Sequence, residues 1–286
     1  MNAIAVIGAG TMGHGIAQVS ALAGYATALT DARPEVLAPA LERIGANLDG
    51  GVERGKLDRA AADAALGRIR LAATIEDAAG DADVVIEAVV EDPEVKHAIF
   101  AQLDRVCRPA ATLATNTSSL SVGRIARAVT QPGRVVGMHF FNPVHIMKLV
   151  EVVTHDRADP AHVARVLAVA RAMGKEPIEV KDAPGFASSR LGVVLGLEAM
   201  RMVEQGVAAP QDIDKALELG YGHPMGPLRV SDLVGLDVRL AIAEHLHREL
   251  GDPQYAPPAI LRAKVAAGDL GKKTGRGFYT WPNKPS

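Results

Sequence analysis

The sequence has one cysteine, no long uninterrupted apolar run and almost no excess of charge of either sign. Cys107 has no second cysteine to pair with, so no disulfide can form within the chain, which suits a reducing compartment. No apolar stretch approaches the roughly 20 residues that span a bilayer, and we expect no signal peptide. A net charge of −2 gives no reason to expect nucleic acid or an anionic membrane as a partner. These absences predict a soluble, cytoplasmic protein.

Secondary-structure patterns divide the 286 residues into two parts. Up to residue 183, short apolar runs alternate with helical patterns, as expected for a parallel sheet covered by helices on both faces. After the Pro184-Gly185 pair, only helical patterns remain. We therefore expect an α/β domain over residues 1–183 and a smaller all-helical domain over residues 184–286. The candidate strands are Ala3–Ile7, Ala26–Thr30, Val84–Val90, Thr112–Ala114, Val135–Met138, Leu149–Val153 and Ile178–Val180. The candidate helices are two within Pro34–Leu66, broken near Gly50-Gly51 and Gly55, then Phe186–Gln205, Pro210–Leu219, Leu236–Leu250 and Pro258–Ala267.

A glycine-rich turn, Gly8-Ala9-Gly10-Thr11-Met12-Gly13, follows the first candidate strand and precedes a helical pattern. In a dinucleotide-binding unit, Gly8 would make the turn tight, Gly10 would let the backbone approach the pyrophosphate, and Gly13 would allow close helix–strand packing. The helix N-terminus then offers N–H groups and a partial positive charge to the phosphates. The turn alone is a weak signal, because glycine-rich turns also occur in unrelated α/β proteins.

An acidic residue strengthens the dinucleotide interpretation. Asp31 ends the second candidate strand, where a carboxylate accepts hydrogen bonds from the adenosine ribose hydroxyls. The same carboxylate would repel a 2′-phosphate, which favours NAD over NADP, although the neighbouring Arg33 weakens that preference. Strand, glycine turn, helix and acid together predict an NAD site.

Groups suited to proton transfer occur further along the chain. His139 ends the candidate strand 135–138, and Glu151 lies within the candidate strand 149–153. Histidine has a pKa near neutrality and can serve as the base for an alcohol proton, while a carboxylate can fix its tautomer and stabilise the imidazolium. Ser118 could donate a hydrogen bond to a substrate oxygen. From spacing alone, a structural role is an equal alternative for His139 and the better one for Glu151.

Several motifs in order make the chain resemble the L-3-hydroxyacyl-CoA dehydrogenase family, and it is similar to the bacterial 3-hydroxybutyryl-CoA dehydrogenases within that family. The resemblance covers almost the whole chain. It is carried by Gly8–Gly13, Glu87–Glu91 with Lys96, Asn116–Leu120, His139–Pro143, Lys148–Glu151, Asp182–Phe186, His223–Pro227 and Lys273–Tyr279.

The resemblance implies a role for each matching position. His139 would be the general base for oxidation and the acid for reduction, with Glu151 as its partner, and Ser118 would contact the substrate oxygen beside the nicotinamide. The cofactor would also be contacted by Asp31, Glu91, Lys96, Asn142 and Lys273. The implied fold is a Rossmann-like domain followed by a helical domain that forms a homodimer. The implied substrate is an acyl-CoA, with Lys56 as the nearest candidate for a CoA contact, and no metal is implied.

One position departs from the family pattern. The family carries asparagine as a further substrate-site donor where this chain has Ser189, whose side chain is shorter by a carboxamide. Serine still donates a hydrogen bond, so the departure bears on acyl chain length and turnover more than on the reaction class. Two alternatives stay open: a related dehydrogenase of a 3-hydroxy acid or sugar acid without CoA, and a non-catalytic NAD-binding protein.

Overall fold

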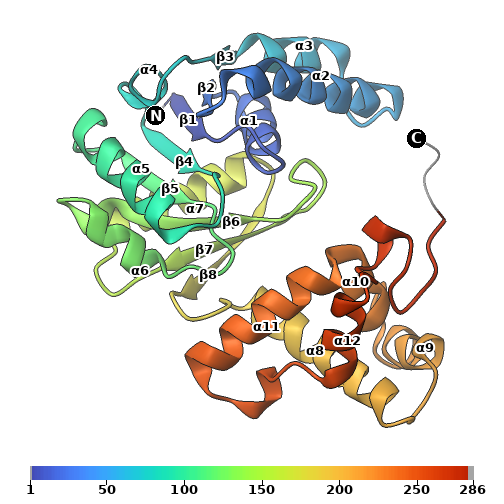
Figure 1. The fold of residues 1–286 in the computed structure, drawn as a ribbon. Coiled ribbons are helices and arrows are strands. Elements are labelled where there is room, and N and C mark those ends of the chain that lie inside the picture. Colours follow the sequence, from blue (N-terminus) through green and yellow to red (C-terminus); the bar gives the residue numbers. More distant parts are fainter. Residues whose placement is uncertain (1, 283–286) are drawn as a thin grey trace. The chain divides into compact units, whose positions relative to one another are not determined.

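The computed structural model describes residues 2–282, and its contacts divide the chain into two compact units, Met1–Ala183 and Pro184–Ser286 (Figure 1). The first unit is an α/β layered structure and the second is helical. Among the described residues, no helix has both the length and the apolar character needed to cross a membrane.

The first unit contains one sheet with the strand order β3-β2-β1-β4-β5-β6-β7-β8. The strands from β3 to β6 are parallel, β7 pairs antiparallel with β6, and β8 pairs parallel with β7. The predicted Rossmann-like α/β fold is therefore confirmed. The strands are β1 (Ala3–Ile7), β2 (Ala26–Thr30), β3 (Ile69–Leu71), β4 (Val84–Glu87), β5 (Thr112–Thr115), β6 (Val135–Phe140), β7 (Leu149–Thr154) and β8 (Glu176–Lys181).

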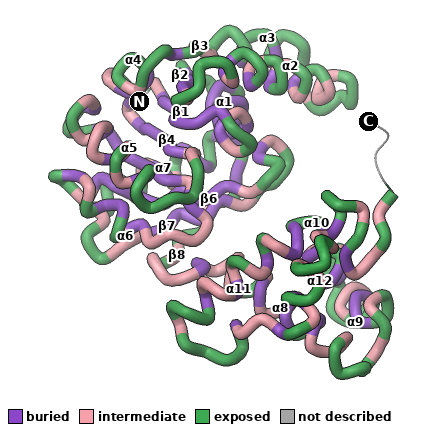
Figure 2. The backbone as a smooth tube through the Cα atoms, viewed as in Figure 1, coloured by how far each residue is buried: buried purple, intermediate pink, exposed green. Residues whose placement is uncertain are grey.

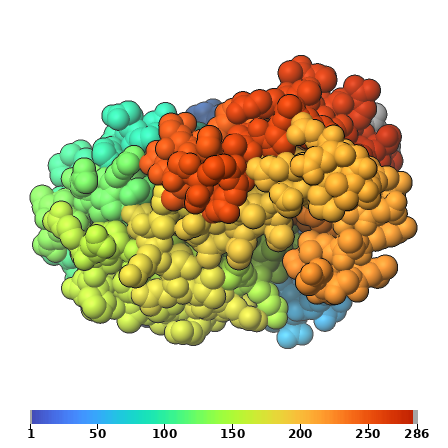
Figure 3. Space-filling model, turned by 90° about the horizontal axis from the view of Figure 1, so that it is seen from below, coloured from blue at the N-terminus to red at the C-terminus, as the bar shows by residue number. Residues whose placement is uncertain are grey.

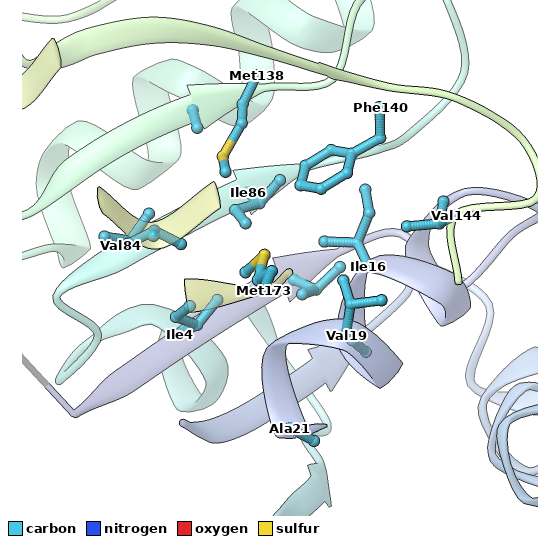
Figure 4. Packing of buried hydrophobic residues seen from close by; sticks show 14 of the residues in the cluster. Ile4, Ile16, Val19, Ala21, Val84, Ile86, Met138, Phe140, Val144 and Met173 are labelled. Carbon is cyan, nitrogen blue, oxygen red and sulfur yellow. The ribbon is translucent and has the colours of Figure 1, made fainter. Parts of the chain in front are cut away.

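Helices cover both faces of this sheet (Figure 1). One face carries an apolar core shared by β1, β4, β6, α1 and α7, where Ile16 and Phe140 are among the buried side chains (Figure 4). The inner strands are buried almost throughout, whereas the helices expose their outer sides (Figure 2). The helices of this unit are α1 (Gly13–Leu22), α2 (Leu37–Glu53), α3 (Arg59–Gly67), α4 (Ile75–Ala79), α5 (Pro93–Val106), α6 (Val122–Ile125) and α7 (Pro160–Ala172).

The second unit packs five α-helices around its own apolar core, which includes Leu197, Leu228 and Leu246. Two buried aspartates organise its C-terminal segment. Asp232 accepts hydrogen bonds from the backbone N–H groups of residues 278 and 279 and from Nε1 of Trp281. Asp214 accepts one from the hydroxyl of Tyr279. The helices are α8 (Ser188–Glu204), α9 (Pro210–Tyr221), α10 (Pro227–Val234), α11 (Leu236–Leu250) and α12 (Ala259–Ala266).

The structure corrects several predicted element boundaries. Strand β3 and helix α10 were not predicted. Strand β3 has three residues and α10 has eight, beginning at a proline, and segments this short carry little periodic signal. Strand β4 ends at Glu87 rather than Val90. Helix α2 continues through Gly50-Gly51, and the chain turns at Gly55, which has a φ of 64°. Helix α9 ends at Tyr221 rather than Leu219.

Candidate active site

The antiparallel pairing of β6 and β7 brings the proposed base and its partner together. His139 and Glu151 lie directly opposite each other in the strand register. Nδ1 of His139 is 2.8 Å from Oε2 of Glu151. His139 is 7% exposed and Glu151 is fully buried, so little water competes with this bond. A carboxylate at Nδ1 favours the tautomer with its proton on Nδ1, which leaves Nε2 as the basic nitrogen.

Two neighbours hold the end of strand β6 in place. Oδ1 of Asn116, which follows β5, accepts a hydrogen bond of 2.9 Å from the backbone N–H of Phe140. The ring of Phe141 lies against the imidazole, with 4.5 Å between the ring centroids. The backbone on either side of the imidazole is thus fixed by a side chain from the adjacent strand and by ring packing.

The loop that carries Ser118 is organised by one carboxylate. Oε1 of Glu91 accepts hydrogen bonds from the Thr117 hydroxyl at 2.5 Å and from the backbone N–H groups of Ser118 and Ser119 at 2.8 and 3.0 Å. The hydroxyl of Ser118 is 3.4 Å from the same oxygen. Glu91 therefore determines where this serine presents its hydroxyl.

A buried lysine, Lys96, forms ion pairs with both Glu91 and Glu87. Nζ of Lys96 lies 2.7 Å from Oε1 of Glu87 and 3.4 Å from Oε2 of Glu91, and neither Lys96 nor Glu87 is exposed. The Thr115 hydroxyl donates a further bond of 2.7 Å to Glu87. Burial alone would raise the pKa of Glu91, but the charge of Lys96 and the three bonds from residues 117–119 outweigh it and lower that pKa. Glu91 is consequently anionic at neutral pH.

Replacement of Lys96 by methionine is expected to destabilise the protein strongly. The change leaves Glu87 buried without its counter-charge, and breaking a buried ion pair in this way typically costs about 3–5 kcal/mol. The unfolding free energy from urea titration measures the effect. Lys148→Met is the matched control. Lys148 is exposed, and its ion pair with the equally exposed Glu176 is long, at 4.0 Å, and contributes little. Equal stability of the two variants would contradict this role for the buried pair.

The glycine-rich turn has the geometry that a dinucleotide requires. A Cβ at Gly13 would lie 1.6 Å from the carbonyl oxygen of Gly8, and Gly8 has a φ of 103°. A Cβ at Gly10 would meet nothing within 4 Å, so open space faces the backbone where a pyrophosphate would approach. Oδ2 of Asp31 accepts a bond of 2.8 Å from the backbone N–H of Ala9, which places the carboxylate beside the turn. Thr11 and Met12 complete the turn before α1.

Two further predicted residues, Asn142 and Lys56, lie in or near the loop after β6 and the end of α2, and only Lys56 lines a cavity there. Asn142 is exposed and precedes a cis peptide bond to Pro143. The following loop is held by Lys175, whose Nζ donates to the carbonyl oxygens of Val144 at 2.5 Å and Met147 at 2.9 Å. Lys56 is exposed and lines a cavity of about 630 Å³ between α1, the end of α2 and this loop. Other residues that line this cavity include Gln18, Asn47, Arg54 and His145.

The remaining predicted residues belong to the second unit. Ser189 is half-buried in the first turn of α8. Lys273 forms an ion pair of 2.6 Å with Asp237 at the start of α11. Within the first unit, the structure therefore brings together three sets of predicted residues: His139 with Glu151, Ser118 with Glu91 and Lys96, and the glycine turn with Asp31. Ser189 and Lys273 belong to the second unit.

Sequence reasoning assigned no individual role to Asn116, Thr117 or Glu87. Asn116 and Thr117 belong to the Asn-Thr-Ser-Ser motif, so a signal was present, but which side chains in it make which bonds depends on strand pairing. In the sequence, Glu87 lies within the candidate strand Val84–Val90. Its role becomes visible only when Lys96, nine residues later in the first turn of α5, folds back against it.

Comparisons with known proteins agree with this geometry. Residues 3–183 match the model of the 3-hydroxyacyl-CoA dehydrogenase NAD-binding domain, and residues 185–281 match that of the 3-hydroxyacyl-CoA dehydrogenase C-terminal domain. A probable 3-hydroxybutyryl-CoA dehydrogenase of Bacillus subtilis is 45% identical, over 99% of this chain and 98% of that protein. The 3-hydroxyadipyl-CoA dehydrogenase of Escherichia coli is 42% identical, over 98% of this chain and 59% of that protein. The crystal structure of (S)-3-hydroxybutyryl-CoA dehydrogenase from Ralstonia eutropha superposes with a TM-score of 0.95 at 37% identity, covering 99% of this chain and 100% of that one.

Proposed function

Because the chain belongs to the 3-hydroxyacyl-CoA dehydrogenase family, we propose that it catalyses the reversible oxidation of an (S)-3-hydroxyacyl-CoA to the 3-ketoacyl-CoA with NAD. The substrate is short-chain, such as 3-hydroxybutyryl-CoA. The observation that carries the proposal is the buried bond of 2.8 Å between His139 and Glu151. A histidine oriented by a buried carboxylate is the arrangement that general acid–base catalysis uses.

The proton of the substrate hydroxyl passes to Nε2 of His139 during oxidation and returns from it during reduction. A bound NAD would supply the acceptor for the hydride of C3. Glu151 holds the imidazole through Nδ1, and its buried charge stabilises the imidazolium that forms. Because the carboxylate is fully buried, its attraction for that charge is only weakly screened.

Donors to the substrate oxygen come from two places. The Ser118 hydroxyl, held by Glu91, donates to the C3 oxygen. Ser189 assists it from the start of α8, where its shorter side chain replaces the asparagine typical of the family. Asn142, exposed at the end of β6, contributes to the same region.

The cofactor is held by the first unit, with the pyrophosphate at the turn Gly8-Ala9-Gly10-Thr11-Met12-Gly13. Asp31 accepts from the ribose hydroxyls, which disfavours NADP. Glu91 contributes to the nicotinamide end of the cofactor. Lys96 is fully buried and therefore acts on the cofactor through Glu91. Lys273 of the second unit is a further residue assigned to cofactor binding. Lys56 and its neighbour Arg54 offer positive charge to the phosphates of CoA beside the 630 Å³ cavity.

We further assign residues 1–183 to cofactor binding and residues 184–286 to dimerisation and part of the substrate site, in a cytoplasmic homodimer of fatty-acid metabolism. The second unit, drawn in yellow-orange to red in Figure 3, exposes several large apolar side chains among its described residues. Leu219 is 83% exposed and Tyr221 is 82% exposed at the end of α9. Exposed apolar side chains of this kind suit a subunit interface.

Disruption of that interface is expected in the double variant Leu219→Glu/Tyr221→Glu. Charged side chains would have to be buried on association, so the dimer weakens. Sedimentation velocity measures the dimer fraction, with Leu22→Glu, an exposed residue of the first unit, as the control. An unchanged dimer would rule out this end of α9 as part of the interface.

A substrate panel with the purified wild-type protein tests the proposal. The absorbance of NADH is followed with acetoacetyl-CoA, free acetoacetate and a keto sugar acid, and acetoacetyl-CoA is repeated with NADPH. We expect turnover with acetoacetyl-CoA and NADH, and little with the other combinations. Preference for a free acid would favour the alternative dehydrogenase without CoA. Absence of turnover with every acyl-CoA would favour a non-catalytic NAD-binding protein.

A dicarboxylic acyl-CoA is a second candidate substrate. The E. coli relative named for 3-hydroxyadipyl-CoA is nearly as similar to this chain as those named for 3-hydroxybutyryl-CoA. The reaction at C3 is the same for both substrates, so the catalytic residues do not distinguish them. The two substrates differ at the far end of the acyl group, where only the dicarboxylic one carries a charge.

A further inference from the structure

The second unit contains a buried cation without a counter-charge. Arg239 in the first turns of α11 is 7% exposed. Its Nε has no hydrogen-bond partner, and among residues 2–282 its guanidinium forms neither a hydrogen bond nor an ion pair. Every other strongly buried charged side chain that the structure describes has a partner, as Lys96, Arg134 and Asp232 illustrate.

A buried guanidinium without a counter-charge is unfavourable unless an anion binds beside it. Buried charges in proteins are almost always paired, because removing a lone charge from water is unfavourable. Burial lowers the pKa of Arg239 to about 10, so the guanidinium is still charged at neutral pH. Its position near the N-terminus of α11 adds to the cost, since a positive charge there opposes the helix macrodipole.

The guanidinium lies against α8 at a glycine. A Cβ at Gly192 would be 3.1 Å from Nη1 of Arg239, so any side chain at this position would press on the guanidinium. Ser189 lies three residues earlier on α8, which places it on the same face about one turn away. One turn advances about 5 Å along the helix. A ligand group a few bonds beyond an atom held by Ser189 would therefore reach Arg239.

We propose that Arg239 is a specificity-determining residue that binds a carboxylate at the far end of the substrate acyl chain. The inference rests on the proposed function, in which Ser189 donates to the C3 oxygen. In a 3-hydroxyadipyl group, three carbon–carbon bonds separate C3 from the terminal carboxylate carbon, a span comparable to the one helical turn from Ser189 to Gly192, beside which the guanidinium lies. A guanidinium can hold a carboxylate with two parallel hydrogen bonds, a geometry that a neutral acyl end cannot use.

Two substrates of equal chain length test the proposal. 3-Ketoadipyl-CoA carries the terminal carboxylate and 3-ketohexanoyl-CoA does not. We expect wild-type kcat/KM with NADH to favour 3-ketoadipyl-CoA, and Arg239→Met to lower it for that substrate by at least about tenfold, mainly through KM. The same variant should leave 3-ketohexanoyl-CoA unchanged or improved. Arg248→Met, an exposed arginine on the same helix, is the matched control and should leave both values unchanged.

The outcomes separate this inference from the proposed function. Turnover of acetoacetyl-CoA without any preference for the terminal carboxylate overturns the inference alone, while absence of turnover with every acyl-CoA overturns both. An equal loss for the two substrates in Arg239→Met assigns the arginine a structural role and contradicts specificity. Loss of the dimer in that variant shows that a carboxylate of a second subunit is the partner, and also contradicts it.

A measurement on the wild-type protein makes the test independent of any variant. Adipyl-CoA and hexanoyl-CoA, which lack the reactive oxygen, are compared as competitive inhibitors of acetoacetyl-CoA reduction. Tighter inhibition by adipyl-CoA, by at least about tenfold, is the expected result. Equal or weaker inhibition by adipyl-CoA would overturn the proposal.

Discussion

Replacement of His139 by alanine is expected to lower kcat by about 10²–10⁴-fold, the range that a positioned acid–base group usually contributes. The imidazole lies at the end of β6, opposite a carboxylate on β7 that orients it. The loss should appear in kcat and kcat/KM alike, because the proton transfer occurs in the transition state. Steady-state reduction of acetoacetyl-CoA with NADH measures it.

The control for this variant is His247→Ala, which removes an exposed histidine of α11. It should leave turnover unchanged. Circular dichroism and the thermal midpoint of His139→Ala, compared with those of the wild-type protein, should show that the variant remains folded. Near-normal turnover in pure His139→Ala would remove this residue from the chemistry.

Replacement of Glu151 by glutamine is expected to have the second-largest effect on turnover, also about 10²–10⁴-fold. Glutamine has nearly the same shape but no charge, so it neither stabilises the imidazolium nor reliably selects the tautomer with its proton on Nδ1. The full burial of Glu151 makes the charge more effective than it would be in water. The kcat of the variant, measured beside that of the exposed Glu176→Gln control, gives the effect.

The double variant His139→Ala/Glu151→Gln sharpens this prediction. If Glu151 acts only through His139, the double variant should be hardly slower than His139→Ala alone, because residues that act as one unit are not additive. Independent, multiplying losses would show that Glu151 has a separate task and would contradict its assignment as the partner of His139.

The sequence predicted the fold well where local signals were strong. The buried strands β1 and β2 and helix α11 are found with the predicted bounds, because apolar runs or helical periodicity ended at clear turn residues. Strand β3 was not predicted, because Ile69-Arg70-Leu71 is short and partly exposed. Gly50-Gly51 suggested a break that did not occur, since packing of α2 against its neighbours outweighs the low helix propensity of glycine.

The candidate site was predictable as a set of residues more than as a set of contacts. Spacing placed His139 and Glu151 on separate strands, but only antiparallel pairing of β7, a non-local event, puts them opposite each other. Lys96 matched a family position, yet its complete burial against Glu87 gives it a supporting place beneath Glu91. Arg239 carried no signal in the sequence at all, because an unpaired charge is recognised only once burial and partners are known.

Transfer of deuterium from C3 to the cofactor is the most direct evidence for the proposed hydride transfer. (S)-3-Hydroxybutyryl-CoA labelled with deuterium at C3 is incubated with NAD and the wild-type protein, and the reduced cofactor is analysed by mass spectrometry. We predict that the label appears in the reduced cofactor, with acetoacetyl-CoA formed in equal amount, and that His139→Ala forms both at least about 100-fold more slowly. Reduced cofactor without the label, or no reaction of this thioester in the wild-type protein, would contradict it.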